Sequence, residues 1–69
     1  MTIHNIVQGV MLDSPTLYTY LYDFNTHELL FQGSLAELLE DGKSYMTFAS
    51  MRIGYDHDRK EPVIIIKGR

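Results

Sequence analysis

Apolar residues near the start of the chain recur at the spacing of one helix face. They occupy positions i, i+3, i+4, i+7 and i+8, namely Ile3, Ile6, Val7, Val10 and Met11. A strand would instead place the adjacent Ile6 and Val7 on opposite faces. Thr2 can cap the first turn. The residue before a proline is disfavoured in the helical conformation, so Asp13-Ser14-Pro15 should end the element. The pattern predicts a helix over residues 3–11.

The spacing then changes to a period of two, which is typical of a β-strand. Over residues 16–24, one face of the predicted strand carries Tyr18, Tyr20, Tyr22 and Phe24, and the other carries Leu17, Thr19, Leu21 and Asp23. Either face can be the core, because both contain apolar residues. Asn25-Thr26-His27-Glu28 supplies turn residues, and a second strand over residues 29–32 would complete a hairpin.

A capping box marks the next element. Ser34 and Glu37 stand three residues apart before an apolar pair, the S-x-x-E pattern that begins a helix. Gly42 stands where a left-handed helix end is expected. We therefore expect a short helix over residues 35–40, with a buried stripe made of Leu35, Leu38 and Leu39.

Two further strands are predicted, over residues 45–55 and 63–67, with a charged loop between them at 56–61. The element order is therefore α-β-β-α-β-β in a single domain spanning residues 1–69. We predict an α+β fold of two layers, in which two short helices cover one face of a four-stranded, mainly antiparallel sheet. The order of the strands in the sheet stays open.

Three segments carry a resemblance to a group of known proteins. With its hairpin "YLYDFNTHELLFQG", its capped helix "SLAELLED" and its terminal strand "PVIIIK", the chain resembles short α+β accessory proteins of phages and mobile elements of Gram-positive bacteria. In that group a glycine often follows the Asn-Thr pair of the turn, where this chain has His27. The resemblance implies an accessory or host-interaction role, and it implies no active site.

Charge and composition bear on where the protein is located and on whether it crosses a membrane. The chain has no cysteine and a net charge of −3, with all six Lys and Arg residues in positions 43–69 and six of the nine acids in positions 1–42. This asymmetry arises either by chance or from a polarised surface that steers partners. The longest apolar run is Val63–Ile66, and the first dozen residues contain no Lys or Arg. We expect a cytoplasmic protein without a membrane span.

The chemistry-bearing residues do not form a recognisable site. Gly42-Lys43-Ser44 matches the end of a phosphate-binding P-loop, but position 37 is Glu where that motif needs glycine. His4, His27 and His57 share no metal-ligand spacing. Asp56-His57-Asp58 lacks the ligand count of a calcium loop. We therefore predict no catalytic, cofactor-binding or metal-binding residues, no cofactor, and a protein that is not an enzyme.

The tyrosine-bearing face is the predicted interface. Helices can cover only one side of a sheet, so Tyr18, Tyr20, Tyr22 and Phe24 would remain on an apolar surface that a partner covers. The leading hypothesis is a non-enzymatic protein-binding module that engages a host protein or pairs with itself as a two-fold homodimer. One alternative is that these aromatics bind single-stranded nucleic acid, although the acidic net charge makes nucleic acid a weaker candidate. Another is that the acid-rich first half mimics nucleic acid and inhibits a host defence enzyme.

Overall fold

The computed structural model describes residues 1–69, apart from the side chain of Met11. In chain order the elements are α1 (Ile3–Asp13), β1 (Tyr18–Asp23), β2 (Leu29–Ser34), α2 (Leu35–Glu40), the 3-10 helix η1 (Gly42–Tyr45), β3 (Phe48–Asp56) and β4 (Glu61–Gly68). The predicted order α-β-β-α-β-β is confirmed, with one added 3-10 turn. The strand predicted over residues 45–55 is wrong at its start, because Tyr45 belongs to η1.

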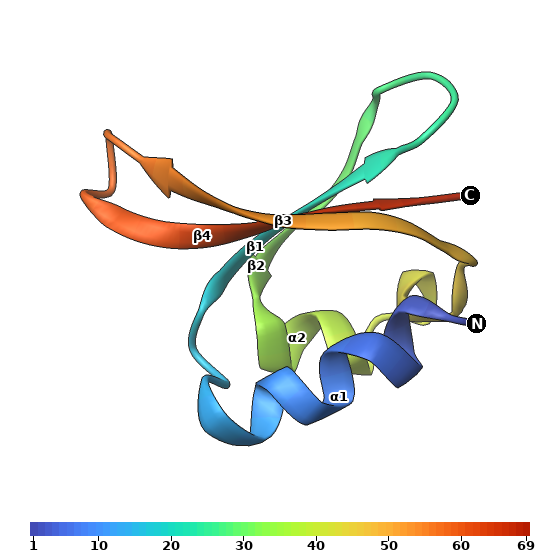
Figure 1. The fold of residues 1–69 in the computed structure, drawn as a ribbon, viewed down its shortest axis with the longest axis horizontal. Coiled ribbons are helices and arrows are strands. Elements are labelled where there is room, and N and C mark those ends of the chain that lie inside the picture. Colours follow the sequence, from blue (N-terminus) through green and yellow to red (C-terminus); the bar gives the residue numbers. More distant parts are fainter.

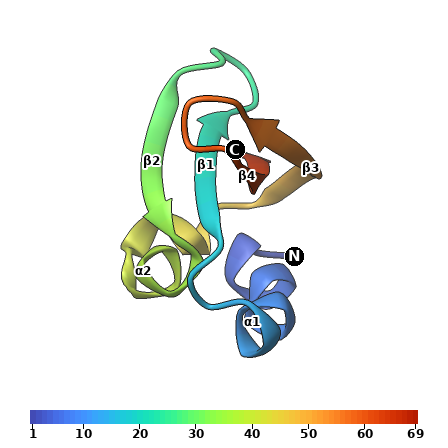
Figure 2. The ribbon, with the colours of Figure 1, turned by 90° about the vertical axis from the view of Figure 1, so that its left-hand side faces the viewer.

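The four strands form one sheet in the order β2-β1-β4-β3, which Figure 2 shows across the molecule. The hairpins β1/β2 and β3/β4 are antiparallel, as predicted, whereas β1 and β4 lie side by side and parallel. The sheet is therefore mixed. Its two central strands come from opposite ends of the chain, because α2 and η1 carry the chain away from β2 before the second hairpin returns against β1.

Both helices pack against the same side of the sheet (Figure 1). The core between the layers consists of Ile3 and Val7 from α1, Leu35 and Leu38 from α2, and Leu21, Ile64 and Ile66 from the central strands. Leu21 and Thr19 are fully buried on β1. The leucine-bearing face of β1 is thus the core, and the tyrosine-bearing face is directed away from the helices.

Side-chain caps define the helix ends. The Thr2 hydroxyl accepts the Asn5 N–H at 3.3 Å, and both halves of the Ser34–Glu37 capping box are formed. The left-handed end predicted at Gly42 is wrong. Helix α2 ends at Asp41, an extended residue, whose carboxylate accepts the Lys43 N–H at 2.9 Å and so begins η1. The Asp41 backbone N–H donates to the Leu38 carbonyl oxygen at 3.0 Å and closes the helix end without a left-handed residue.

The two hairpin turns have the same construction. Asp23 and Asp56 open them, and each carboxylate accepts the backbone N–H groups two and three residues later. The residue four positions after each aspartate, His27 or Lys60, is left-handed, with φ of 63° and 56°. His27 and Lys60 therefore adopt a left-handed backbone conformation that favours glycine.

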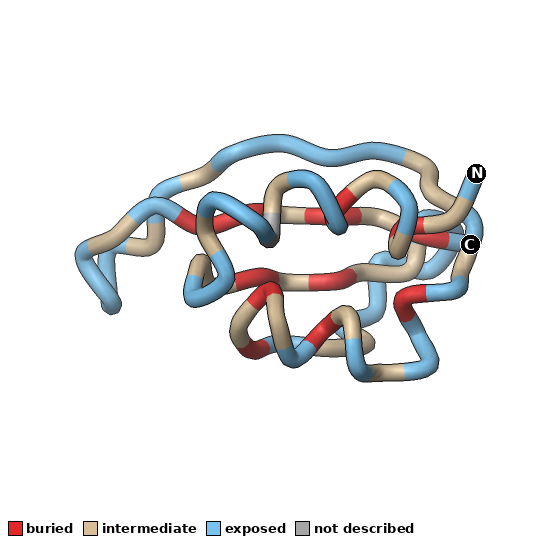
Figure 3. The backbone as a smooth tube through the Cα atoms, turned by 90° about the horizontal axis from the view of Figure 1, so that it is seen from below, coloured by how far each residue is buried: buried red, intermediate tan, exposed pale blue. Residues whose placement is uncertain are grey.

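Strand β3 lies outside the cover of the helices. Figure 3, drawn from the helix side, shows it largely exposed at the rim of the sheet. Helix α1 packs over the central strands and contributes Ile3 and Val7 to the core. From Met51 to Tyr55, the face of β3 that points toward the helix layer is therefore left without a covering element. Phe48, at the start of the strand, packs against the core and donates its N–H to the Met1 carbonyl oxygen.

Candidate functional site

Three tyrosines of β1 stand in a row on the open face of the sheet. Tyr18, Tyr20 and Tyr22 are half-buried, and they lie beside Val63, Ile65 and Lys67 of β4 in register. Phe24 follows the end of β1 and is 42% exposed. The structure therefore brings the predicted tyrosines together on a face that no helix covers, with Phe24 beyond the strand.

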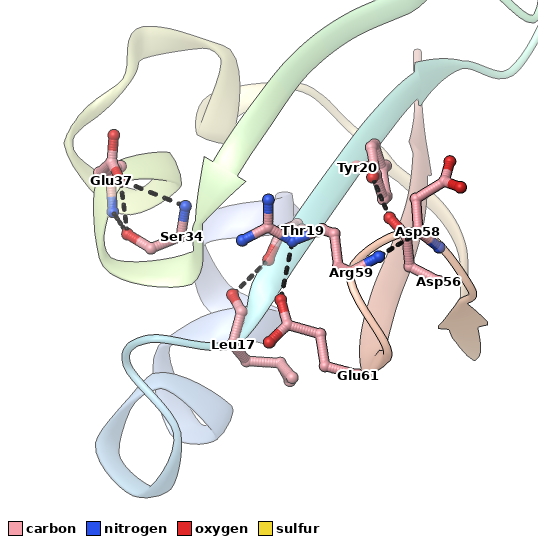
Figure 4. Close-up of polar contacts among 9 residues, drawn as sticks. All are labelled: Leu17, Thr19, Tyr20, Ser34, Glu37, Asp56, Asp58, Arg59 and Glu61. Carbon is pink, nitrogen blue, oxygen red and sulfur yellow. Dashed lines mark hydrogen bonds and ion pairs between the residues drawn. The ribbon is translucent and has the colours of Figure 1, made fainter.

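The β3/β4 turn contacts two of these three tyrosines. The Tyr20 hydroxyl donates to Asp56 Oδ2 at 2.6 Å (Figure 4). The Arg59 guanidinium lies 3.7 Å from the centre of the Tyr18 ring. Arg59 is held in turn by Glu61, to which its Nε donates at 2.8 Å. Tyr18 and Tyr20 therefore contribute to an internal contact between the two hairpins.

The bond between Tyr20 and Asp56 shifts both acidities. The hydrogen bond to the carboxylate, with desolvation, raises the pKa of Tyr20 to about 12. The same bond, with the turn N–H groups, lowers the pKa of Asp56 below 3.8. The Tyr20 contribution to stability is present below pH 10 and is lost between about pH 10 and 12. The Asp56 contribution is present above its usual pKa and is lost as pH falls through the lowered value.

Replacing the Asp56 carboxylate should lower the pKa of the Tyr20 hydroxyl. We expect Asp56→Asn to lower the Tyr20 pKa from about 12 toward 10.0, because the amide carries no charge to favour the protonated phenol. An ultraviolet titration of the tyrosines, with the Tyr20 resonance followed by NMR, measures the shift. Asp58→Asn removes the same charge from the same turn without touching Tyr20, and an equal shift in that variant would contradict the assignment.

The other half of the open face forms a pocket. Tyr22, His27, Arg52, Ile65 and Lys67 line a cavity of about 240 Å³. Tyr22 neighbours Lys67 across β1 and β4, and Ile65 neighbours Arg52 across β4 and β3. His27 comes from the β1/β2 turn. This pocket joins residues from three strands and a turn, a set that no local sequence pattern identifies.

A second exposed surface lies on the opposite face of the sheet. Met51, Ile53 and Tyr55 of β3 are 38%, 65% and 55% exposed. They alternate along the strand and share the face of Ile64 and Ile66, so they form one apolar row, here called the β3 strip. The alternation of Met51, Ile53 and Tyr55 is visible in the sequence, but the sequence-based prediction placed the interface on the tyrosine-bearing face of β1 and not here.

The phosphate-loop-like segment and the histidines do not come together in one site. Ser44 is fully buried in η1, and Lys43 pairs with Asp41 at 3.6 Å, so this segment does not present the amide cradle of a P-loop. His4 stacks on Tyr45 and His57 packs edge-on against Tyr55, each with ring centres 5.0 Å apart. The described residues contain no group of three His, Cys, Asp or Glu side chains placed to hold a metal ion.

Comparison with known proteins gives no assignment. The chain matches no protein-family model, no curated protein and no solved structure. Among the described residues, no helix has the length and apolar character that crossing a membrane requires.

Proposed function

We propose that this chain is a non-enzymatic, cytoplasmic protein-binding module that binds by adding a partner's strand to the free edge of β3. The observation that carries the proposal is the position of the β3 strip. Three large apolar side chains lie side by side along an edge strand, beyond the cover of the helices. Exposed apolar rows of this kind are typical of interaction surfaces.

The edge itself favours strand addition. An edge strand presents backbone N–H and C=O groups that a further strand can pair, and natural proteins usually protect such edges with charges, prolines or short length. Strand β3 has nine residues, of which Phe48 already donates its N–H to the Met1 carbonyl oxygen, so the free edge follows Phe48. Its single Lys or Arg is Arg52, on the opposite face from the strip. An added strand would satisfy the backbone and cover the strip with its own apolar side chains.

These features define the partner strand. It should be extended, carry apolar residues at alternate positions, and avoid a cation opposite Arg52. A second copy of β3 meets these conditions when the two strands pair antiparallel and Ile53 lies opposite Ile53 of the copy. Met51 then faces Tyr55, and Arg52 faces Gly54, which has no side chain. The resemblance to phage and mobile-element accessory proteins makes a host protein with such a strand the other partner that we expect.

Crosslinking from the strip tests the proposal. A photoreactive benzoylphenylalanine at position 53 should form an adduct near twice 8.0 kDa in the purified chain if the partner is a second copy. In the lysate of a Gram-positive host, an adduct to one host protein should appear if the partner is foreign. The Met51→Lys substitution should reduce either adduct at least tenfold, since it places a charge within the contact.

The matched control is Leu29, an exposed aliphatic residue on the opposite edge strand β2. The probe at position 29 should not give the adducts formed from position 53. Equal adducts from both positions, or no adduct from position 53 in either setting, would contradict strand addition at β3. Interface formation by the tyrosine row stays a separate prediction, and it has weaker support because Tyr18 and Tyr20 already contact Arg59 and Asp56.

A further inference from the structure

The pocket on the open face lies on the opposite side of the sheet from the β3 strip and has a different chemistry. Two of its five lining residues, Arg52 and Lys67, are cations, and the set contains no carboxylate. Tyr22 contributes an aromatic ring to the lining of the pocket, and Ile65 contributes an apolar side chain. The proposed binding of a protein at β3 does not use any of these residues.

The two cations have no internal partner among the described side chains, where ion pairs join Lys43 to Asp41 and Arg59 to Glu61. Asp23 Oδ1 accepts the N–H groups of Asn25 and Thr26 at 2.7 and 2.9 Å, and this carboxylate forms no ion pair with either cation. The pocket therefore has a local positive charge although the whole chain is acidic.

The register also brings these cations together. Ile65 pairs with Arg52 and Lys67 pairs with Ser50, so Arg52 and Lys67 are diagonal neighbours on one face. Diagonal neighbours of an antiparallel pair lie roughly 7–8 Å apart. The two cationic side chains therefore start from neighbouring positions on one face, where like charges repel each other and a bound anion would offset the repulsion.

We propose that this pocket binds a phosphate group attached to a flat ring, as in a nucleotide. The Arg52 guanidinium can donate two parallel hydrogen bonds to phosphate oxygens, and Lys67 supplies a second positive charge. The ring of the ligand stacks on Tyr22 above Ile65. The volume of about 240 Å³ is below the roughly 300–1,000 Å³ of pockets for drug-sized molecules, so it limits the ligand to at most one nucleotide unit.

An NMR titration of the full chain tests this pocket with three probes: inorganic phosphate, thymidine monophosphate and a single-stranded thymidine oligonucleotide. Shifts should concentrate at the five lining residues, and the monophosphate should bind more tightly than inorganic phosphate. Arg52→Gln and Lys67→Gln should each weaken binding of the monophosphate roughly tenfold or more, because each removes a charge-assisted bond. Tyr22→Leu should weaken binding of the monophosphate and leave that of inorganic phosphate unchanged.

Lys60→Gln is the matched control, since it removes the same charge from the exposed β3/β4 turn, outside the pocket. Its affinity for thymidine monophosphate should equal that of the unaltered chain. Tighter, strongly salt-dependent binding of the oligonucleotide would identify a nucleic-acid strand as the source of the nucleotide unit, and equal affinity would identify a free nucleotide.

Three results would overturn the proposal. These are no localised shifts with any probe at millimolar concentration, equal losses in the Lys60 variant and the pocket variants, and equal affinity for phosphate and nucleotide. The Met51→Lys variant should retain nucleotide binding. A failure of strand addition at β3 and a failure of this pocket are therefore seen in separate measurements.

Discussion

Ile64→Ala should lower the free energy of unfolding by about 2–5 kcal/mol, the range for removing a large aliphatic side chain from a packed core. Ile64 is 1% exposed and belongs to the cluster that joins α1, α2 and the central strands. A domain of this size has a total stability of roughly 3–10 kcal/mol. The substitution should therefore remove a large part of it, and urea denaturation followed by circular dichroism measures the loss.

Ile53 provides the matched control because it pairs with Ile64 across β3 and β4 and lies on the same face. It is 65% exposed, since the helices do not reach β3. Ile53→Ala should change the stability of the monomer by no more than about 0.5 kcal/mol. Equal losses in the two variants would mean that the β3 strip is covered in the isolated chain, and would contradict both the fold description and the proposed interface.

Gly68→Ala should destabilise the protein by about 1–3 kcal/mol through crowding. A Cβ at this position would lie 2.6 Å from Ile3 Cδ1 and 3.3 Å from the Thr47 carbonyl oxygen. Ile3 is fully buried, so it cannot move away without displacing its neighbours. The residue next to Gly68 is also tied to this place, because Thr47 and Arg69 exchange two backbone hydrogen bonds.

The same substitution at Gly9 should have the opposite sign. Nothing lies within 4 Å of a Cβ built there, and Gly9 is an exposed position inside α1. Gly9→Ala should stabilise the protein by about 0.8–1 kcal/mol, since alanine has the higher helix propensity. Melting temperatures of the two variants, compared with the unaltered chain, test both expectations. A lower melting temperature for the Gly9 variant would contradict the exposed position in α1.

Local chemistry accounts for the parts of the fold that the sequence predicts well. The capping box at Ser34 and Glu37 places α2 at residues 35–40, as predicted, because both partners lie within one turn. The helix predicted over 3–11 extends to Asp13, and the proline at position 15 limits it. The pattern D-x-[DN]-x-x-E recurs at positions 23–28 and 56–61, but the turn geometry that the two segments share was not predicted from it.

The candidate surfaces were only partly predictable. Period-two spacing correctly places Tyr18, Tyr20 and Tyr22 on one face, because side chains alternate along any strand. Nothing in that spacing shows that Asp56 and Arg59, far along the chain, would contact two of these rings. The pocket at Tyr22 likewise requires the neighbouring positions of β1, β4 and β3.

The sequence by itself determined the kinds of elements, their order, and which residues share a strand or helix face. These depend on contacts between residues a few positions apart, which side-chain periodicity and capping groups control. Tertiary structure alone decided that β4 lies parallel to β1, that Leu21 rather than Tyr20 faces the core, and that β3 lies outside the helices. The physical reason is that both faces of β1 are apolar enough to be buried. The choice between them therefore depends on where the helices and the second hairpin pack together.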